Sequence, residues 1–346
     1  HVFGNTKYKP YLSSNYTNFI IKKKFFLSTN KQYVENFLKH EERINSDLIE
    51  VHNRPNYIEI IKKRYFKKLF LYFHNDPLQM NGSRLIIQRI NLLNSVDKIL
   101  FNSEWSRKRF FMNLPKEIDL LKKTAICFQS SSKVKIDFSK KEKIISFVGK
   151  LNRAKGYDLF GSAIIKILDK YPAWKSNVYG DEPREKLLFE HKSLKIFGFK
   201  DNKKILKDLK KTSISVVCSR WEEPFGRTSL EAASRGSAVI ISNRGGLPET
   251  APDAIKLKTI SSVNIFKEIE KLIINKKRLM MLQKINYKNF KFTHSYISNI
   301  IDKIRKSVHG NNDINMFNIK RNLVLKIIHL TNFNRRFNGR LHYNTG

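Results

Sequence analysis

The stretch ISVVCSRWEEPFGRTSLEAASR, residues 214–235, decides the fold. Its first six residues form a nearly continuous apolar run, which is typical of a strand buried on both faces. Pro224 and Gly226 then allow a tight turn. Thr228 and Ser229 follow, and their hydroxyl groups are suited to cap a helix over the last eight residues. A strand, a polar turn and a helix in this order indicate a parallel α/β sheet.

The same alternation repeats along the chain. The predicted strands are 47–52, 69–74, 98–103, 124–129, 144–149, 176–180, 194–198, 214–219 and 238–242. The predicted helices are 104–112, 157–171, 202–211 and 228–235. Several strands are apolar throughout, which indicates sheets covered by helices on both faces. The fold class is therefore α/β, with two facing Rossmann-like domains.

A polar stretch, SSSKVKIDFSKKEK at 130–143, separates two series of strands and helices. We place an N-terminal domain at 1–130, a linker at 131–143 and a C-terminal domain at 144–290. The run LVLKIIHL at 323–330 reads as another strand and is followed by a polar loop. The tail 311–346 is thus interpreted as the start of a further domain, with a docking tail as the alternative.

Composition narrows the class of protein. The chain has 346 residues, 41% of them hydrophobic, and a formal net charge of +37. No apolar run approaches the roughly 18 residues of a membrane span. Cys127 and Cys218 lie in apolar runs, which favours buried free thiols in a reducing compartment. The charge indicates either an AT-rich genome or an anionic partner. Because the lysines are scattered, no dedicated nucleic-acid arm is expected.

The turn after strand 214–219 suits a ligand with two hydroxylated ends and a charged middle. The first N–H groups of the following helix can bind an anion such as a diphosphate. Glu231, one turn inside that helix, can accept hydrogen bonds from a vicinal diol such as a ribose. Glu223, before the turn, can reach a second polyol. This combination predicts a nucleotide sugar, whereas the simplest alternative is a capped helix with two solvated glutamates.

A second loop, FVGKLNRAKG at 147–156, follows another strand. Gly149 permits a close approach of the backbone. Lys150 and Lys155 lie near a helix N-terminus and can neutralise a diphosphate leaving group. The alternative is a pair of solvated lysines in a lysine-rich chain.

These motifs, together with VYGD at 178–181 and NRGGLPE at 243–249, resemble the donor half of family 4 retaining glycosyltransferases of the GT-B fold. The resemblance spans roughly residues 45–310. It implies a C-terminal helix at 291–310 that packs back towards the N-terminal domain. Lys150, where the family usually has Arg, and Lys155 would hold the diphosphate.

The resemblance also assigns the remaining site residues. In the N-terminal half, His74 resembles the family's cleft histidine, and His52 ends a neighbouring strand. The implied catalytic residues are His74, Glu223 and Lys155. The implied donor-binding residues are Gly149, Lys150, Lys155, Gly180, Phe199, Glu223, Phe225, Gly226, Arg227, Thr228 and Glu231. The implied acceptor-side residues are His52, Asn53, Asn75 and Asp76. No metal ligand and no cofactor is expected.

The expected activity is retaining transfer of a sugar from a UDP- or GDP-sugar to a saccharide or glycolipid, of cell-envelope polysaccharide or lipopolysaccharide type. This would be a hexosyltransferase-type enzyme. The family's first strand and Gly-rich loop have no counterpart before Asp47, so we interpret the chain as a fragment with an incomplete N-terminal domain. The alternatives are a GT-B nucleotide-sugar epimerase, a catalytically impaired glycan- or nucleotide-binding fragment, and a basic nucleic-acid-binding protein.

The expected location is the cytoplasm, peripherally at the inner face of an anionic plasma membrane. Nucleotide sugars are cytoplasmic metabolites, acceptors in this family are often lipid-linked, and basic residues are attracted to anionic lipid. Tyr65 and Phe66, within KKRYFKK at 62–68, are predicted to seat at the lipid interface. The alternative for that stretch is a solvated helix face.

Overall fold

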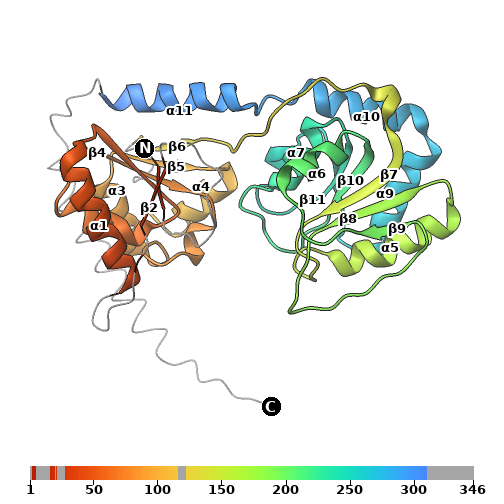
Figure 1. Cartoon of the computed structure of the whole chain (residues 1–346), viewed down its shortest axis with the longest axis horizontal. Helices are drawn as coiled ribbons and strands as arrows, with labels where there is room; N and C mark the ends of the chain where they lie inside the picture. The colour runs from red at the N-terminus through yellow and green to blue at the C-terminus, as the bar shows by residue number, and fades with distance from the viewer. Residues whose placement is uncertain (1, 5–15, 20, 22–27, 116–121, 310–346) are drawn as a thin grey trace, which may run out of the picture.

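The structure is a computed structural model that describes residues 2–4, 16–19, 21, 28–115 and 122–309. Figure 1 shows two α/β halves side by side, with helix α11 extending from the second half over the first. The predicted strand 323–330 and the tail 311–346 lie outside the described residues. In the part of the chain that is described, no helix is long and apolar enough to cross a membrane.

The N-terminal half contains a parallel sheet with a simple strand order. In space the order is β3 (Leu48–His52), β4 (Lys68–Phe73), β5 (Lys98–Phe101) and β6 (Thr124–Ile126). A separate parallel pair consists of β1 (Val2–Gly4) and β2 (Tyr16–Asn18). The helices of this half are α1 (Thr29–Ile44), α2 (Ile58–Lys62), α3 (Ile86–Ser95) and α4 (Glu104–Phe111).

The C-terminal half is a doubly wound sheet of six parallel strands in the order β12-β11-β10-β7-β8-β9. Their bounds are β7 (Glu142–Val148), β8 (Lys175–Tyr179), β9 (Leu194–Ile196), β10 (Thr212–Val217), β11 (Ala238–Ser242) and β12 (Ile255–Leu257). The helices are α5 (Tyr157–Lys170), α6 (Asn202–Leu209), α7 (Arg227–Ser234), α8 (Leu247–Thr250), α9 (Ser262–Ile274) and α10 (Lys276–Lys288). The strand order reverses between β7 and β10, and such a switch point is where open α/β sheets bind ligands.

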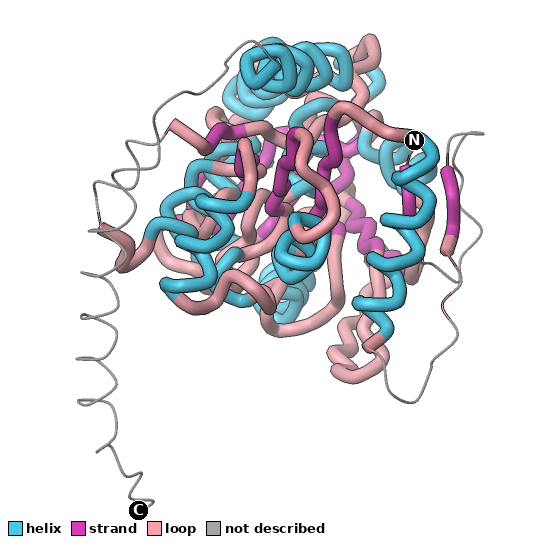
Figure 2. Tube along the Cα trace, turned by 90° about the vertical axis from the view of Figure 1, so that its left-hand side faces the viewer, coloured by secondary structure: helices cyan, strands magenta, loops and turns pink. Residues whose placement is uncertain are grey.

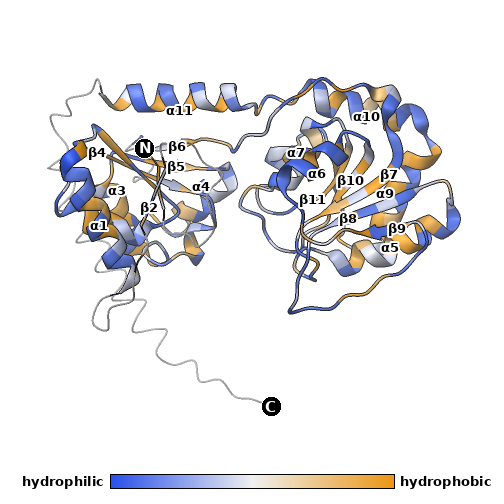
Figure 3. Ribbon diagram, viewed as in Figure 1, coloured by the Kyte–Doolittle hydropathy of each residue, from blue (hydrophilic) through white to orange (hydrophobic). Residues whose placement is uncertain are grey.

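Helices enclose the strands, and the strands are apolar. Figure 2 shows most of the strands in the interior, and Figure 3 shows hydrophobic colours on strands of both halves. Residues 69–73 of β4 and 214–217 of β10 are buried. The α/β fold class is therefore confirmed, and each predicted strand between 47 and 242 overlaps an observed one.

Helix α11 (His294–His309) belongs to the C-terminal end of the chain but packs on the N-terminal sheet. Its apolar residues Ile297, Ile300 and Ile304 join a core that also contains Phe70 and Tyr72 of β4. Charge supports the same contact, because Arg305 donates two hydrogen bonds to the Glu50 carboxylate of β3, at 2.9 and 2.6 Å. The chain thus ties its two halves together after the second half is complete.

Three local predictions are wrong. The cap of α7 is Gly226, and Thr228 and Ser229 lie inside the helix. The predicted linker 131–143 overlaps the first two residues of β7, whose exposed Glu142 and Lys143 disguise the strand start. Tyr65 is only 7% exposed and its hydroxyl donates to the carbonyl of Ser46, so it cannot seat in lipid. Both cysteines are buried and unpaired, as predicted.

Candidate active site

A cavity of about 330 Å³ lies between the two halves, at the carboxyl ends of both sheets. Its N-terminal wall is built from residues that directly follow β4 and β5 and from one residue shortly after β6. Its C-terminal wall comes from the ends of β7 and β10 and from the first turn of α7. The lining residues are His74, Asn75, Asn102, Gln129, Phe147, Val148, Gly149, Lys155, Val217, Ser219, Glu223, Pro224, Phe225, Gly226, Arg227 and Thr228.

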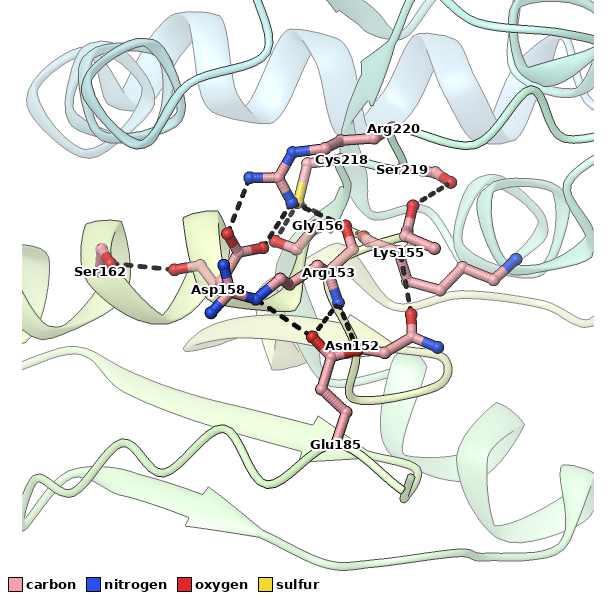
Figure 4. Close-up of polar contacts among 11 residues, drawn as sticks. Asn152, Arg153, Lys155, Gly156, Asp158, Ser162, Glu185, Cys218, Ser219 and Arg220 are labelled. Carbon is pink, nitrogen blue, oxygen red and sulfur yellow. Dashed lines mark hydrogen bonds and ion pairs between the residues drawn. The ribbon is translucent and has the colours of Figure 1, made fainter. Parts of the chain in front are cut away.

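The loop after β7 is clamped to the end of β10 (Figure 4). Asn152 Oδ1 accepts a hydrogen bond from the backbone N–H of Lys155 at 3.0 Å. Ser219 Oγ donates to the carbonyl of Ala154 at 3.1 Å, and Arg220 pairs with both carboxylate oxygens of Asp158 on α5. These contacts hold the backbone that carries Lys155 at a fixed place beside the cavity.

Lys155 and Glu223 form an ion pair inside the cavity wall. The side chain of Lys155 is 31% exposed and that of Glu223 is 13% exposed. The two residues come from loops that follow different strands of the sheet. A ligand with an anionic group and hydroxyl groups can therefore meet the ammonium and the carboxylate together.

The N-terminus of α7 faces the same cavity. Gly226 is the N-cap and has φ of 103°, in the left-handed region that favours glycine. No side chain caps this helix, because its N-cap is a glycine, and Ser229 Oγ donates to the carbonyl of Gly226. Arg227 and Thr228 of the first turn line the cavity. Uncapped N–H groups and the positive end of the helix dipole suit an anion here.

Glu231 lies deeper along α7 and is buried. Its Oε1 accepts hydrogen bonds from Asn202 Nδ2 at 2.9 Å and from Arg227 Nη2 at 3.1 Å. Arg227 thus connects the carboxylate to the edge of the cavity. Glu231 itself is not among the lining residues.

On the N-terminal wall, His74 has a partner at each ring nitrogen. Its Nε2 lies 2.9 Å from His52 Nδ1, and its Nδ1 lies 3.2 Å from Gln129 Nε2. Burial, with a further contribution from His52, lowers the pKa of His74 to about 4, so the ring is neutral at pH 7. Asn53 Oδ1 accepts from the backbone N–H groups of His74 and Asn75 and so fixes the loop after β4.

The two walls are joined by direct hydrogen bonds. Ser103, the N-cap of α4, donates to the carbonyl of Pro224. Glu249 accepts from the backbone N–H groups of Glu104 and Trp105 at 2.7 and 2.9 Å, at the N-terminus of α4. Burial raises the pKa of Glu249. This contact seats the first turn of α4 against the C-terminal half, beside the cavity.

The structure brings together only part of the predicted site. The predicted residues that line the cavity are His74, Asn75, Gly149, Lys155, Glu223, Phe225, Gly226, Arg227 and Thr228. Those outside its lining are His52, Asn53, Asp76, Lys150, Gly180, Phe199 and Glu231.

Two of these outliers have clear structural roles. Asp76 is buried, where its carboxylate pairs with Arg109 at 2.9 Å and caps a short 3-10 helix, so its predicted acceptor-side role is corrected. At Gly180 an added Cβ would lie 1.8 Å from the carbonyl oxygen of Gly149, which explains the need for glycine where β7 and β8 end.

Sequence reasoning missed several contributors to the site. Asn102, Gln129 and Ser219 line the cavity, and Glu249 joins its walls. Asn102 and Ser219 fall at the ends of predicted strands, so their place beyond the carboxyl ends of β5 and β10 was a usable signal. Glu249 ends the stretch NRGGLPE, but its contact with α4 could not be predicted, because its partner lies 145 residues away.

Comparison with known proteins identifies the domain that holds most of this site. Residues 128–289 match the family glycosyl transferases group 1. This stretch of the chain is similar to group 1 glycosyltransferases. A putative glycosyltransferase of Bacillus subtilis, YtcC, is 24% identical over 309 residues, which covers 78% of this chain and 75% of that protein.

Solved structures show that the GT-B fold extends over both halves. Sucrose-phosphate synthase from Thermosynechococcus elongatus has a TM-score of 0.68 at 16% identity, over 84% of this chain and 81% of that one. HepE of Anabaena in complex with UDP has a TM-score of 0.63 at 16% identity, over 80% and 82%. The predictions of a GT-B fold and of a hexosyltransferase-type glycosyltransferase are confirmed.

Proposed function

We propose that this group 1 glycosyltransferase moves a sugar from a nucleoside diphosphate sugar to a saccharide or glycolipid acceptor, with retention of configuration. The observation that carries the proposal is the single cavity in which Lys155, Glu223 and the N-terminus of α7 face His74 and Asn75 of the other half. Because the structure of HepE contains UDP, UDP-sugars are the first donors to test, followed by GDP-sugars.

In the proposed mechanism the diphosphate leaves first. Lys155 and the uncapped N–H groups of Arg227 and Thr228 stabilise its charge, and Lys150 approaches from the same loop. Glu223 binds hydroxyl groups of the sugar, while Glu231 binds the ribose and is oriented through Arg227. The acceptor hydroxyl attacks from the face that the diphosphate leaves, and a phosphate oxygen takes its proton.

The acceptor side of the proposal rests on a second cavity. It has a volume of about 940 Å³, runs along β3, and is lined by aromatic and polar residues that include Tyr33, Tyr57, Asn53 and Arg54. His52 lines this second cavity and contacts His74 of the first. Aromatic faces beside amide and guanidinium groups suit a saccharide.

In this scheme the lysine side chains and the N-terminus of α7, rather than a metal ion, would neutralise the diphosphate. We therefore expect turnover to persist in EDTA, as measured by product formation with and without added Mn²⁺ or Mg²⁺. Complete loss in EDTA that either ion restores would contradict this part of the proposal.

The deciding experiment is a thermal-shift screen of nucleotide sugars on the full chain. The true donor should raise the midpoint of unfolding, because a ligand of the native state stabilises it in proportion to its concentration over Kd. NMR of the product with that donor should then show the same anomeric configuration as the donor. Free nucleotide sugar with an inverted ring carbon and no transfer would instead indicate the epimerase alternative.

A further inference from the structure

Four side chains form a polar row that starts beneath helix α11 and ends at the cavity. His52 Nε2 lies 3.9 Å from Glu50 Oε2, and both residues lie on one face of β3. His52 Nδ1 lies 2.9 Å from His74 Nε2, and His74 Nδ1 lies 3.2 Å from Gln129 Nε2. Glu50, His52, His74 and Gln129 are called the polar row below.

The anionic end of the polar row is Glu50. Burial alone would raise the pKa of this carboxyl, but the nearby His52 ring and the hydrogen bonds from Arg305 outweigh it and lower the pKa to about 2. Glu50 is therefore ionised at neutral pH and can only accept hydrogen bonds. Arg305 of α11 fills one side of the carboxylate, which leaves His52 on the other.

The ionised Glu50 carboxylate determines which atom donates and which accepts in each hydrogen bond of the polar row. A neutral imidazole carries one proton, so His52 with its proton at Nε2, towards Glu50, accepts at Nδ1. His74 must then donate from Nε2 and accept at Nδ1. Gln129 donates from its amide nitrogen, and its carbonyl oxygen Oε1 remains as the acceptor at the cavity end.

The neighbours of the two imidazoles support a fixed arrangement. The His52 and His74 rings stack with centroids 5.3 Å apart and an interplanar angle of 10°. Tyr72 of β4 packs on His74 with centroids 4.1 Å apart, and its hydroxyl donates to the carbonyl of Cys127. The charged groups that face the pair are Glu50 of β3 and Arg305 of α11.

We propose that Gln129 is a specificity residue that accepts a hydrogen bond from a hydroxyl of the donor sugar, and that His52 and Glu50 are positioning residues that fix its amide through His74. This inference rests on the proposed function. It predicts a preference for a sugar with a free hydroxyl at the position that faces Gln129. The deoxy analogue at that position leaves the amide oxygen without this hydrogen bond.

The first test needs no turnover. Nitrogen-15 NMR of the histidine rings in the full chain at pH 7.5 should show His52 and His74 both neutral and both protonated at Nε2. A ring protonated at Nδ1 in either residue overturns the proposed direction. This result is independent of whether the chain transfers a sugar.

The second test uses kcat/KM for the donor and for its deoxy analogues. Gln129→Leu and His52→Leu should each lower the preference for the hydroxyl donor about tenfold, the ratio that one neutral hydrogen bond supplies. His52→Asn should retain it, because the Asn Oδ1 can take the place of His52 Nδ1 and accept from His74. Affinity for UDP alone should stay unchanged in all of them.

Two results would overturn the assignment of Gln129. One is full preference in Gln129→Leu. The other is an equal loss of UDP affinity in His52→Leu and His52→Asn, which would mean a structural role. If no nucleotide sugar is bound or turned over at all, the proposed function fails, whereas the NMR result still decides the direction of the polar row.

Discussion

At the scale of single residues, the site depends on charges that the sequence keeps far apart. Lys155 and Glu223 are separated by 68 positions, yet they form an ion pair in the cavity wall. Such a pair contributes little to folding, since partly exposed ion pairs are worth about 0–1 kcal/mol. Its value is to hold an ammonium group where the leaving diphosphate is proposed to lie.

Lys155→Ala is therefore expected to reduce kcat by about 100-fold or more while the midpoint of thermal unfolding barely moves. Lys277→Ala, on the exposed surface of α10, is the matched control and should change neither quantity. Parallel losses of activity and stability in Lys155→Ala would show that the lysine is structural.

Glu231→Ala is expected to weaken nucleotide binding roughly 10- to 100-fold, because a charged hydrogen-bond acceptor is worth about 1.5–3 kcal/mol. Preference among donor sugars should change little, since the carboxylate is assigned to the ribose. Calorimetry with the nucleotide measures this, with Glu222→Ala, an exposed carboxylate of the same stretch, as control. Unchanged affinity in Glu231→Ala would make the ribose assignment wrong.

Single-residue roles were only partly predictable from sequence. Positions just after apolar runs, such as Gly149 and His74, could be placed at the cavity because parallel strands end on one edge. Gln129 was inside a predicted strand end, and only the folded structure shows that it lines the cavity and contacts His74. Asp76, which looked equally accessible in sequence, is buried by Arg109, a partner 33 positions away.

At the scale of elements, apolar runs predicted the positions of the strands reliably, whereas the exact ends of strands and helices could not be predicted. Strands buried on both faces, such as β10 and β11, are recognisable because every position must be apolar or small. The start of β7 was missed because Glu142 and Lys143 are exposed. The cap of α7 was misplaced because two hydroxyl residues look like caps, while Gly226 supplies the required backbone angle.

Lys141, a residue of the predicted linker, connects three elements of the C-terminal half. Its Nζ donates to the carbonyls of Leu209, Thr212 and Arg235, at 3.3, 2.8 and 2.7 Å, just before β7 begins. Burial, with a smaller effect of Arg235, lowers the pKa of Lys141 to about 7. The lysine therefore joins the end of α6, the start of β10 and the end of α7.

Lys141→Met is expected to lower the free energy of unfolding by roughly 2–4 kcal/mol, because it removes one donor from each of three buried carbonyls. Urea denaturation measures the change, and Lys140→Met, whose side chain is 80% exposed, is the control. Equal stability of the two variants would show that the carbonyls find other donors and that Lys141 does not organise this junction.

At the scale of the whole molecule, the two halves are held in register from three directions. Glu249 binds the N-terminus of α4, Ser103 binds the carbonyl of Pro224, and Arg305 of α11 binds Glu50. The existence of two α/β halves could be predicted from the polar stretch between two strand series. Their contacts could not, because each joins residues more than 100 positions apart.

The net charge of +37 would attract the enzyme to an anionic membrane. The stretch 62–68 was the predicted contact, and the structure changes which of its residues can act. Arg64 pairs with Glu35 and Glu42, and Lys68 pairs with Asp97, so part of its charge is compensated locally. Phe66 is 80% exposed and is the residue of this stretch that can enter lipid.

Binding to anionic liposomes is therefore expected to combine the long-range charge of the chain with the insertion of Phe66. It should appear with anionic lipid, vanish with neutral lipid and fall in high salt, because such attraction fades within a Debye length. Phe66→Ser should weaken it about tenfold, as expected for an aromatic side chain that no longer leaves water. Phe199→Ser, equally exposed in the other half, is the control in co-sedimentation assays. Equal binding to both lipids, or to neither, would contradict the proposed membrane association. An effect of Phe199→Ser alone would indicate that the C-terminal half contacts the lipid.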